Sequence, residues 1–582
     1  MLSDQRTVAI VDPYGAIVWL CLPRIDSSAV FSALVSDPSR GVWSVEPEGA
    51  EGPPVQQYKG DSLILETVWK TGAGPMKLTD YMDVSGGRAY QRAGRSELVR
   101  VLEGAGRWKV ILRPRLDFGR ASTRLVAREG GLEVDGWPDP IVVRSAGVTW
   151  RIEEEGKSHT ALAEIESSAG PVVLELRYGT ASLAATPNGE SARREAVLRF
   201  WSGWAASLRI PSVQPELVKR SALAIKALCH GPTGAIAAAG TTSLPEHLGG
   251  VRNWDYRFCW VRDACMSASS LTRLGNTGAA LKLLDWLVQV VEHTDSPERL
   301  RPLYTVAGGH LLPEAEIGEL QGYGGSRPVR VGNAASQQIQ LDVFGPVVEL
   351  VALVAEFGAP VTPDHWRLVE AMVNAVSSRW EEPDHGIWEL RNEKRHHVHT
   401  KAMCWFAVDR AIAVAEKAMG YRRPQWAELR ERISRDILEK GWDPHAGSFT
   451  TAYGYPALDA STLFVGLTGL LPIKDERFVA TVRAVEQGLR RGPVVDRYRG
   501  EDGLPGREGG WVICMTWLIE AMAMNGQRER GLELFAELCK LAGPTGLMSE
   551  EFEPDLGIAL GNFPQAYSHL GVINAAVALS KP

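Results

Sequence analysis

A chain of 582 residues exceeds what one hydrophobic core usually supports, so we expect two domains or at most three. It is 45% hydrophobic and 23% charged, and its net charge of -7 mixes both signs without a basic stripe, which argues against a nucleic-acid partner. No signal peptide and no apolar run long enough for a membrane span are visible, so we expect neither secretion nor a membrane partner. Seven cysteines, an odd number without a CxxC pair, predict reduced thiols in a cytoplasmic protein without a zinc site.

Residues 1–205 are predicted to form β-strands. Gly, Pro, Asp and Ser clusters separate these β-rich runs: VAIVD, AIVWLCL, LILETVWKT, SELVRVLEG, WKVILRPRL, GLEVDG, PIVVRS, VTWRIE, HTALAEIE and VVLELRYG. Close-set strands without helices between them predict an antiparallel β-sandwich. Residues 190–204 predict a helix that leaves the sandwich, and ASLRIPSVQPE predicts a linker.

Residues 213–582 are predicted to be helical. The twelve predicted helices span 215–230, 262–275, 277–294, 340–357, 365–382, 399–419, 425–442, 460–471, 476–489, 511–526, 527–542 and 569–582. The even-numbered helices are apolar nearly all round and the odd-numbered ones carry a charged face, which predicts six inner helices ringed by six outer ones. We expect an (α/α)6 barrel, although an open solenoid would give a similar period.

A long loop follows every odd-numbered helix, and the alternation places all six on one face. The loops span 231–261, 295–339, 383–398, 443–459, 490–510 and 543–568. Long structureless loops in a compact domain are usually functional.

The third loop, within Pro383 to Arg410, carries Trp388 and Glu389 just ahead of an apolar helix. A carboxyl group beside an indole can be held neutral near pH 7, as a general acid requires. The nearby histidines, in the order H-H-x-H, do not match a zinc-ligand spacing, so we expect them to form hydrogen bonds at the helix entrance.

The first loop ends in GGVRNWDYRFCWVRD, residues 249–263. Arginines and aspartates set among aromatic rings suit sugar hydroxyls. The alternative is a buried ion-pair network at a helix start, with Asp263 as its cap. The 19 tryptophans allow the same two interpretations, since indole rings pack on sugars but more often lie in a core.

The sixth loop carries Glu550 and Glu551, which in isolation would often be a solvated pair. The third and sixth loops lie half-way round a ring of six hairpins, so Glu389 and this pair should face each other. Two carboxyls about 6.5–9.5 Å apart, with a water between them, would cleave a glycosidic bond with inversion.

These motifs together resemble glycoside hydrolase family 15, the family of glucoamylases, glucodextranases and trehalases, over essentially the whole chain. The motifs are RNWDYRFCWVRD, GSRPVRVGNAA, GIWELR, RYRGED and SEEF with GNFPQAYSHLG. The resemblance implies an amino-terminal β-sandwich, a helical linker and an (α/α)6 catalytic barrel.

The resemblance also implies roles for individual residues. Glu389 is similar to the family's general acid and Glu550 to its general base, with Glu551 where many members have Gln. The expected substrate-binding residues are Arg262, Asp263, Trp260, Tyr256, Trp388, Arg497 and Glu551. No cofactor and no metal are expected.

The expected activity is that of an inverting, exo-acting α-glucosidase that needs only a small carbohydrate as partner. The lack of a carbohydrate-binding module and of a Ser/Thr-rich linker argues against raw starch. Because bacterial members of the resembled family with this layout include trehalases, we favour α,α-trehalose. Maltooligosaccharides and isomaltooligosaccharides are the alternative substrates, and an inverting phosphorylase and a non-catalytic sugar-binding protein are less favoured. Formation of a homo-oligomer is left open.

Overall fold

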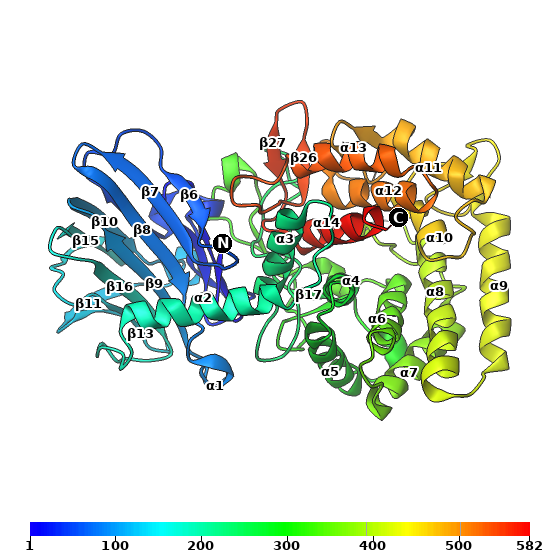
Figure 1. The fold of residues 1–582 in the computed structure, drawn as a ribbon, viewed down its shortest axis with the longest axis horizontal. Helices are drawn as coiled ribbons and strands as arrows, with labels where there is room; N and C mark the ends of the chain where they lie inside the picture. The colour runs from blue at the N-terminus through cyan, green and yellow to red at the C-terminus, as the bar shows by residue number, and fades with distance from the viewer. Residues whose placement is uncertain (392, 501, 582) are drawn as a thin grey trace.

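The computed structural model describes residues 1–391, 393–500 and 502–581. Strands make up its amino-terminal part and helices its carboxyl-terminal part, and α2 (Glu190–Ala206) runs between the two (Figure 1). Asn392 and Glu501, which fall in two of the predicted loops, and Pro582, the end of the last predicted helix, lie outside the described residues.

Two antiparallel sheets form the amino-terminal part. The first has the order β1 (Leu2–Ser3), β2 (Val8–Val11), β3 (Ile17–Cys21), β5 (Val42–Pro47), β10 (Arg107–Arg113), β15 (Ser158–Glu166) and β14 (Arg151–Glu155), with β4 (Ala29–Phe31) beside β3. The second has the order β11 (Arg124–Arg128), β12 (Gly131–Asp135), β13 (Ile141–Arg144), β16 (Val172–Tyr178), β9 (Ser96–Glu103), β8 (Gly74–Met82), β7 (Leu65–Thr71) and β6 (Val55–Tyr58). The apolar faces of the two sheets meet. Trp69 of the second sheet packs edge-on against Trp108 of the first, with 5.8 Å between their ring centroids.

All ten predicted strand runs contain strands, but six strands escaped prediction: β1, β4, β5, β6, β8 and β11. The nine-residue β8 is the clearest case, because its sequence GPMKLTDYM lacks an apolar alternation. Asp80 of β8 is fully buried where an apolar residue would be expected, and Arg100 of β9 donates to it at 2.9 Å. A polar pair thus takes the place of an apolar contact.

All twelve predicted helices are present. The outer ones are α3 (Pro215–Leu228), α5 (Gly278–Glu292), α7 (Pro363–Arg379), α9 (Pro424–Lys440), α11 (Glu476–Leu489) and α13 (Arg528–Cys539). The inner ones are α4 (Val261–Arg273), α6 (Phe344–Glu356), α8 (Val398–Val414), α10 (Phe464–Leu467), α12 (Val512–Met524) and α14 (Ala566–Leu579). The burial follows the predicted alternation. Nearly every residue of the inner helix α12 is buried, whereas the outer helix α9 buries a single stripe of four residues.

The inner helices contact one another in the order α4, α6, α8, α10, α12 and α14, and α14 returns to contact α4. The predicted helix 460–471 is shorter than expected, because a 3-10 turn (Ala460–Leu463) precedes the four residues of α10. Gly466 lies so close to Phe478 of α11 that a Cβ atom there would sit 2.2 Å from the ring. Outside the sequence predictions lies one short helix, α1 (Gly87–Arg92).

The prediction that the long loops lack secondary structure is wrong. They hold the pairs β17 (Cys259–Trp260) with β18 (Leu303–Tyr304), β19 (Ala315–Glu316) with β20 (Arg330–Val331), and β21 (Trp442–Asp443) with β22 (Ser448–Phe449). A five-stranded sheet joins the last two loops in the order β23 (Arg490–Arg491), β24 (Val494–Val495), β25 (Gly510–Trp511), β26 (Glu551–Glu553) and β27 (Ile558–Leu560). Runs of two or three residues are too short to show a period.

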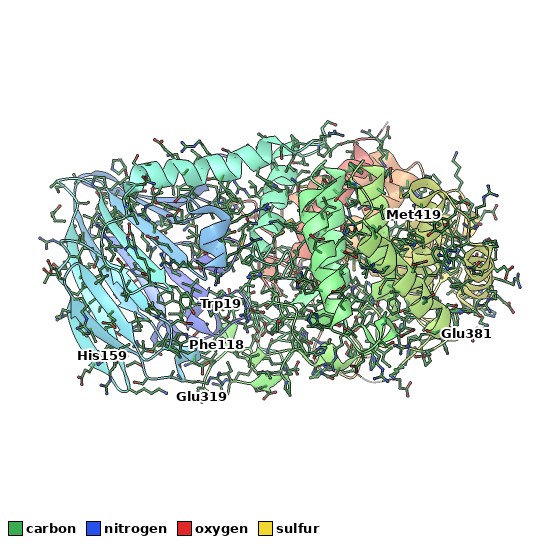
Figure 2. The ribbon with its side chains drawn as sticks, turned by 90° about the horizontal axis from the view of Figure 1, so that it is seen from below. Trp19, Phe118, His159, Glu319, Glu381 and Met419 are labelled. Atoms are coloured by element: carbon green, nitrogen blue, oxygen red, sulfur yellow. The ribbon has the colours of Figure 1, made fainter. Side chains whose placement is uncertain are left out.

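Buried apolar residues of the sheets and of the helices form one hydrophobic cluster that crosses the boundary between the two regions. Trp19 packs on Phe118 near this boundary (Figure 2), and its Nε1 donates to the carbonyl of Gly240 at 2.9 Å.

The seven cysteines are free thiols, as the sequence predicted. In the described part of the chain, no helix is both long enough and apolar enough to cross a bilayer.

Candidate active site

Two adjoining pockets lie where five of the six long loops meet, which agrees with the prediction that these loops share a face; the fourth loop supplies none of the described residues that line either pocket. Pocket A, about 410 Å³, is lined by Ala238, Tyr256, Trp260, Arg262, Asp263, Ile387, Trp388, Glu389, Arg497, Trp511, Glu550, Gln565 and Tyr567. Pocket B, about 510 Å³, is lined by Glu246, Arg252, Trp254, Tyr256, Asn333, Ala335, Gln338, Trp388, Glu389, Leu390, Arg391, Arg497, Tyr498, Asp502 and Leu504. Four residues line both pockets: Tyr256, Trp388, Glu389 and Arg497.

Pocket A brings together eight of the nine residues predicted for the site. They come from four loops and from the first turn of α4. Glu551 is the exception, since it is absent from the described residues that line either pocket. Glu550, rather than Glu551, therefore faces the space that a ligand could fill.

Glu389 occupies a left-handed turn, with φ +58°, a conformation that few residues other than glycine adopt without cost. Its Oε1 accepts hydrogen bonds from Trp260 Nε1 at 2.6 Å and from Gln340 Nε2 at 3.1 Å, and Arg262 Nη2 lies 3.6 Å away. The indole that contacts this carboxyl is therefore that of Trp260. The adjacent Trp388 donates instead to Asp459, at 3.0 Å.

Arg262 and Asp263 lie side by side in the first turn of α4. Arg262 donates to Gln340 at 2.9 Å, to Asp342 at 3.0 Å and to the hydroxyl of Tyr567 at 2.9 Å. These bonds fix the guanidinium beside Glu389. Asp263 Oδ1 is buried and accepts no hydrogen bond, although Arg262 Nε lies 3.4 Å from it, and burial raises the pKa of this carboxyl to about 7. A buried acceptor without a donor is suited to a ligand hydroxyl.

Glu550 immediately precedes β26 and is almost wholly buried. Its Oε2 accepts from the backbone N–H of Asn562 at 3.2 Å, and its Oε1 accepts from Gln565 Nε2 at 3.5 Å. Burial raises the pKa of this carboxyl to about 8. Gly561 has φ +71°, and a Cβ atom there would lie 2.4 Å from Glu550 Oε2, so only glycine leaves room for the carboxyl.

Aromatic rings and one arginine form a wall common to the pockets. The guanidinium of Arg497 lies 4.4 Å from the ring centroid of Trp511 and 5.3 Å from that of Trp388. Glu508 accepts from Arg497 Nε at 2.8 Å and fixes its orientation. Four of the 19 tryptophans line the pockets, so most lie elsewhere, as the alternative interpretation predicted.

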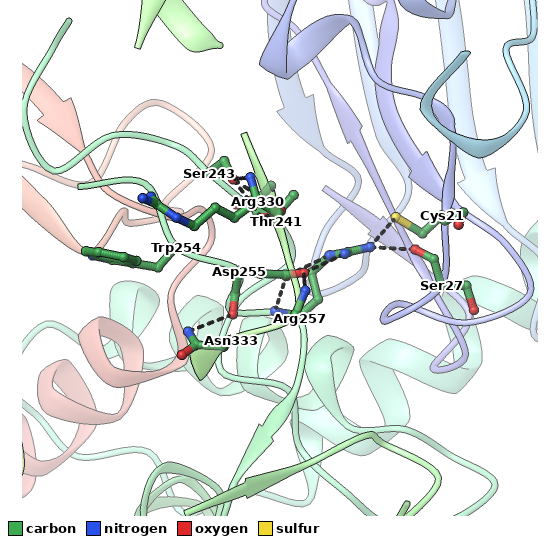
Figure 3. A network of polar contacts seen from close by, with 12 residues as sticks. Cys21, Ser27, Thr241, Ser243, Trp254, Asp255, Arg257, Arg330 and Asn333 are labelled. Carbon is green, nitrogen blue, oxygen red and sulfur yellow. Dashed lines mark hydrogen bonds and ion pairs between the residues drawn. The ribbon is translucent and has the colours of Figure 1, made fainter. Parts of the chain in front are cut away.

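The segment that carries Tyr256 is anchored from behind by an ion pair (Figure 3). Arg257 donates to both oxygens of Asp255, at 2.8 and 2.6 Å, and also to Cys21 Sγ and to the carbonyl of Ser27 in the sheet region. Gly332 of the second loop donates its N–H to Asp255 at 3.1 Å. The buried-network interpretation is therefore correct for Asp255 and Arg257, while their neighbours Trp254, Tyr256 and Trp260 line the pockets.

One group of acidic side chains has a spacing that a metal ion could use. It consists of Glu246, Glu550 and Glu551, and we name it the carboxyl cluster. One oxygen of each lies within 4.8 Å of the others. A cation of the protein already borders it, because Arg497 Nη2 lies 4.0 Å from Glu246 Oε2.

The histidine run at the third loop contributes no such group among the described residues. His397 and His399 are buried, and burial lowers the pKa of each to about 4, so both are neutral near pH 7. His396 stacks on Tyr453.

Sequence reasoning missed Gln340, Trp511 and above all Glu246. Gln340 and Trp511 stand at the starts of predicted inner helices, a position that could have suggested them. Glu246 lies in SLPEHLGG, which contains no motif, and it reaches the site only through the path of the first loop.

Comparisons with known proteins identify the family of this chain. The model of glycosyl hydrolases family 15 matches residues 212–577, and that of the trehalase-like N-terminal domain matches residues 1–201. A trehalase of Mycobacterium tuberculosis is 35% identical, over 99% of this chain and 88% of its own length. A trehalase of Thermoplasma volcanium is 32% identical, over 100% of this chain and 93% of its own length.

Among solved structures, a bacterial glucoamylase complexed with acarbose superposes with a TM-score of 0.72 at 14% identity. The superposition covers 100% of this chain and 94% of that one. At this identity the likeness concerns the fold, which joins amino-terminal antiparallel sheets to a helical region. The family match covers more than half of the chain, and so this glycoside hydrolase belongs to glycosyl hydrolases family 15.

Proposed function

We propose that this enzyme hydrolyses α,α-trehalose to two glucose molecules, with inversion at the carbon that is attacked. One observation carries the proposal: pockets A and B meet at Glu389, and only pocket A also contains Glu550. A disaccharide that places one ring in each pocket puts its glycosidic oxygen at Glu389. The trehalases that align over the full chain support this choice of substrate.

Pocket A would hold the glucose unit that is attacked. Asp263 Oδ1, which accepts no hydrogen bond, would accept one from a sugar hydroxyl, and Arg262 Nη2, which lies 3.6 Å from Glu389, would donate to another. Pocket B would hold the departing glucose against Trp254, Tyr256 and Arg252. Polar side chains with fixed partners can bind a small sugar without large rearrangement.

Glu389 would act as the general acid and Glu550 as the general base. The carboxyl proton of Glu389 passes to the glycosidic oxygen as the bond from that oxygen to the anomeric carbon breaks. A water attacks this carbon from the opposite face, and Glu550 takes one proton from the water. The enzyme then carries its proton on Glu550, and exchange with solvent restores both groups.

We also propose a fold for each of the two domains. We assign an antiparallel β-sandwich with a helical linker at its end to residues 1–205, and an (α/α)6 barrel to residues 213–582. The contact of α14 with α4, which returns the inner helices to their start, supports a closed barrel over an open solenoid. A cytoplasmic location and the absence of a cofactor stay predictions.

Proton NMR during hydrolysis tests both the substrate and the stereochemistry. Trehalose joins two α-anomeric carbons, so inversion first releases α- and β-glucose in equal amounts, whereas retention releases only the α-anomer. Maltose, isomaltose and soluble starch are assayed in parallel. Faster cleavage of one of these would identify the alternative glucohydrolase, and a requirement for phosphate would identify a phosphorylase.

A further inference from the structure

Glu246 is an acidic residue of the site that no motif revealed. It lines pocket B and its side chain is almost wholly buried. The backbone holds it firmly between two loops, because its N–H donates to the carbonyl of Arg252 at 3.0 Å and its carbonyl accepts from Gly509 at 3.1 Å. The position of Glu246 beside Glu550 is thus fixed by the fold.

The three members of the carboxyl cluster differ in their partners. Glu550 accepts hydrogen bonds from Asn562 and Gln565. For Glu246 and Glu551, in contrast, all four carboxyl oxygens are buried and lack a hydrogen-bond partner among the described residues. A buried carboxylate without a donor is costly, so Glu246 and Glu551 are unlike ordinary ion-paired residues.

The charged groups around the cluster cannot neutralise three carboxylates. Arg252 is bound to Asp502 and Glu508, and Arg497 is bound to Glu508 and is the nearest cation to Glu246, at 4.0 Å. Arg330, whose charge also acts on Glu246, is paired with Glu314 at 3.5 Å and with Glu316 at 3.9 Å. Carboxyl groups therefore outnumber guanidinium groups around the cluster. The phenols of Tyr256 and Tyr498 complete the titratable surroundings.

Like charges at this spacing in a buried site cannot all ionise. The negative charge should settle on the carboxyl that has donors, which is Glu550, and protons should remain on the other two. A protonated carboxyl has an O–H group that can donate a hydrogen bond. One of Glu246 and Glu551 can therefore donate to Glu550, and the other can donate to that protonated partner.

We propose that Glu246 and Glu551 are positioning residues that stay protonated and hold the Glu550 carboxylate in place through donated hydrogen bonds. This proposal rests on the assignment of Glu550 as the general base. It also explains why acidic Glu551 is tolerated next to the base. An ionised Glu551 would compete with Glu550 for the proton of the attacking water.

The electrostatic surroundings of the three carboxyl groups agree with this arrangement. Burial, followed by the charge of Glu508, raises the pKa of Glu246 well above its ordinary value, and burial followed by the charge of Glu246 does the same for Glu551. Burial raises the pKa of Glu550 only to about 8.

Substitution by glutamine and by leucine tests the proposal. An amide can still donate a hydrogen bond whereas leucine cannot. Glu246→Gln and Glu551→Gln should therefore keep kcat within about 10-fold of wild type, and the leucine variants should lose roughly a further 10–10²-fold, the worth of one hydrogen bond to a charged group. A merely structural role would lower the stability of the leucine variants without this difference in kcat.

The pH dependence of stability gives a second readout, which needs no substrate. A carboxyl whose pKa is raised by folding stabilises the protein below its unfolded pKa of about 4.3, and this contribution is lost as pH rises toward the folded pKa. As the pH rises above about 4.3, each glutamine variant should therefore lose less stability than wild type. Infrared difference spectra, wild type minus variant, should show the carbonyl band of a neutral carboxylic acid.

Three results would overturn the proposal. The first is a loss in kcat for Glu246→Gln or Glu551→Gln as large as that for Glu550→Gln. The second is an infrared band of an ionised carboxylate in place of the neutral acid. The third is stabilisation of wild type by Mg²⁺ or Ca²⁺ that the glutamine variants lack, which would make the cluster a cation site. If trehalose is not the substrate, the NMR assay fails while the stability and infrared readouts still decide the protonation.

Discussion

Replacement of Arg257 by methionine should lower both the stability of the enzyme and its activity. The side chains of Asp255 and Arg257 are 0% and 2% exposed and form two bonds of 2.6 and 2.8 Å. Methionine keeps much of the apolar stem but leaves the Asp255 carboxylate buried without its guanidinium. Loss of one partner of a buried ion pair costs about 3–5 kcal/mol.

The effect on activity follows from the place of this pair behind the pocket wall. Arg257 links the sheet region to the segment that carries Tyr256, and Asp255 links the same segment to Gly332. Once the anchor is gone, Tyr256 and Trp260 can shift relative to Glu389. A displacement of about 1 Å at a reacting centre can cost on the order of 10²-fold in rate, so we expect kcat/KM to fall by about that factor.

Arg100→Met is the matched control. Arg100 and Asp80 form an equally buried pair at 2.9 Å, between β8 and β9 of the sheet region and away from both pockets. Denaturant midpoints followed by circular dichroism should fall for both variants. Initial rates of glucose release, at a low temperature where every variant is folded, should fall only for Arg257→Met. Equal losses of activity in the two variants, or wild-type kcat/KM in Arg257→Met, would refute the reasoning.

Three further predictions concern the chemistry. Glu389→Gln and Glu550→Gln should each lower kcat by about 10²–10⁴-fold with an unchanged circular dichroism spectrum, and near-wild-type turnover in either variant would reject its role. Because burial raises the pKa of Glu550 to about 8, kcat/KM should rise with pH toward that value; an acid limb at the ordinary carboxyl pKa of about 4.3 would contradict this. Burial also lowers the pKa of His399 to about 4, whereas an unfolded histidine has a pKa of about 6.5. The unfolded state binds more protons between these values, so the urea midpoint should fall from pH 7 to pH 5, and His399→Gln should weaken this dependence.

The helical region was largely predictable because its signal is repeated and strong. An apolar helix such as α12 and a charged one such as α9 differ over three or more turns, so their alternation identifies the inner and outer helices. The strands were harder. β8 escaped because its core position is filled by Asp80, whose burial depends on Arg100 in another strand, a contact that the sequence of β8 does not encode.

Site residues that belong to family motifs could be predicted from the sequence. Site residues that reach the pockets only because of the path of a loop could not. Glu389, Arg262 and Asp263 stand in such motifs and line pocket A. Glu246 stands in none, and its burial depends on partners in the first and fifth loops. Motifs likewise could not distinguish the side chains of residues 252–260 that face the pocket from those that face the sheets.

The side chains of residues 252–260 that face away from the pockets indicate one role for the sheet region. Alternate side chains of an extended segment point to opposite sides. Tyr256 therefore enters the pockets while Arg257 reaches Ser27 and Cys21 in the sheet region. The sheet region supplies none of the described pocket-lining residues, but it fixes the segment that does. Pockets A and B meet at Glu389, and one wall that they share is therefore held in place by the neighbouring sheet region.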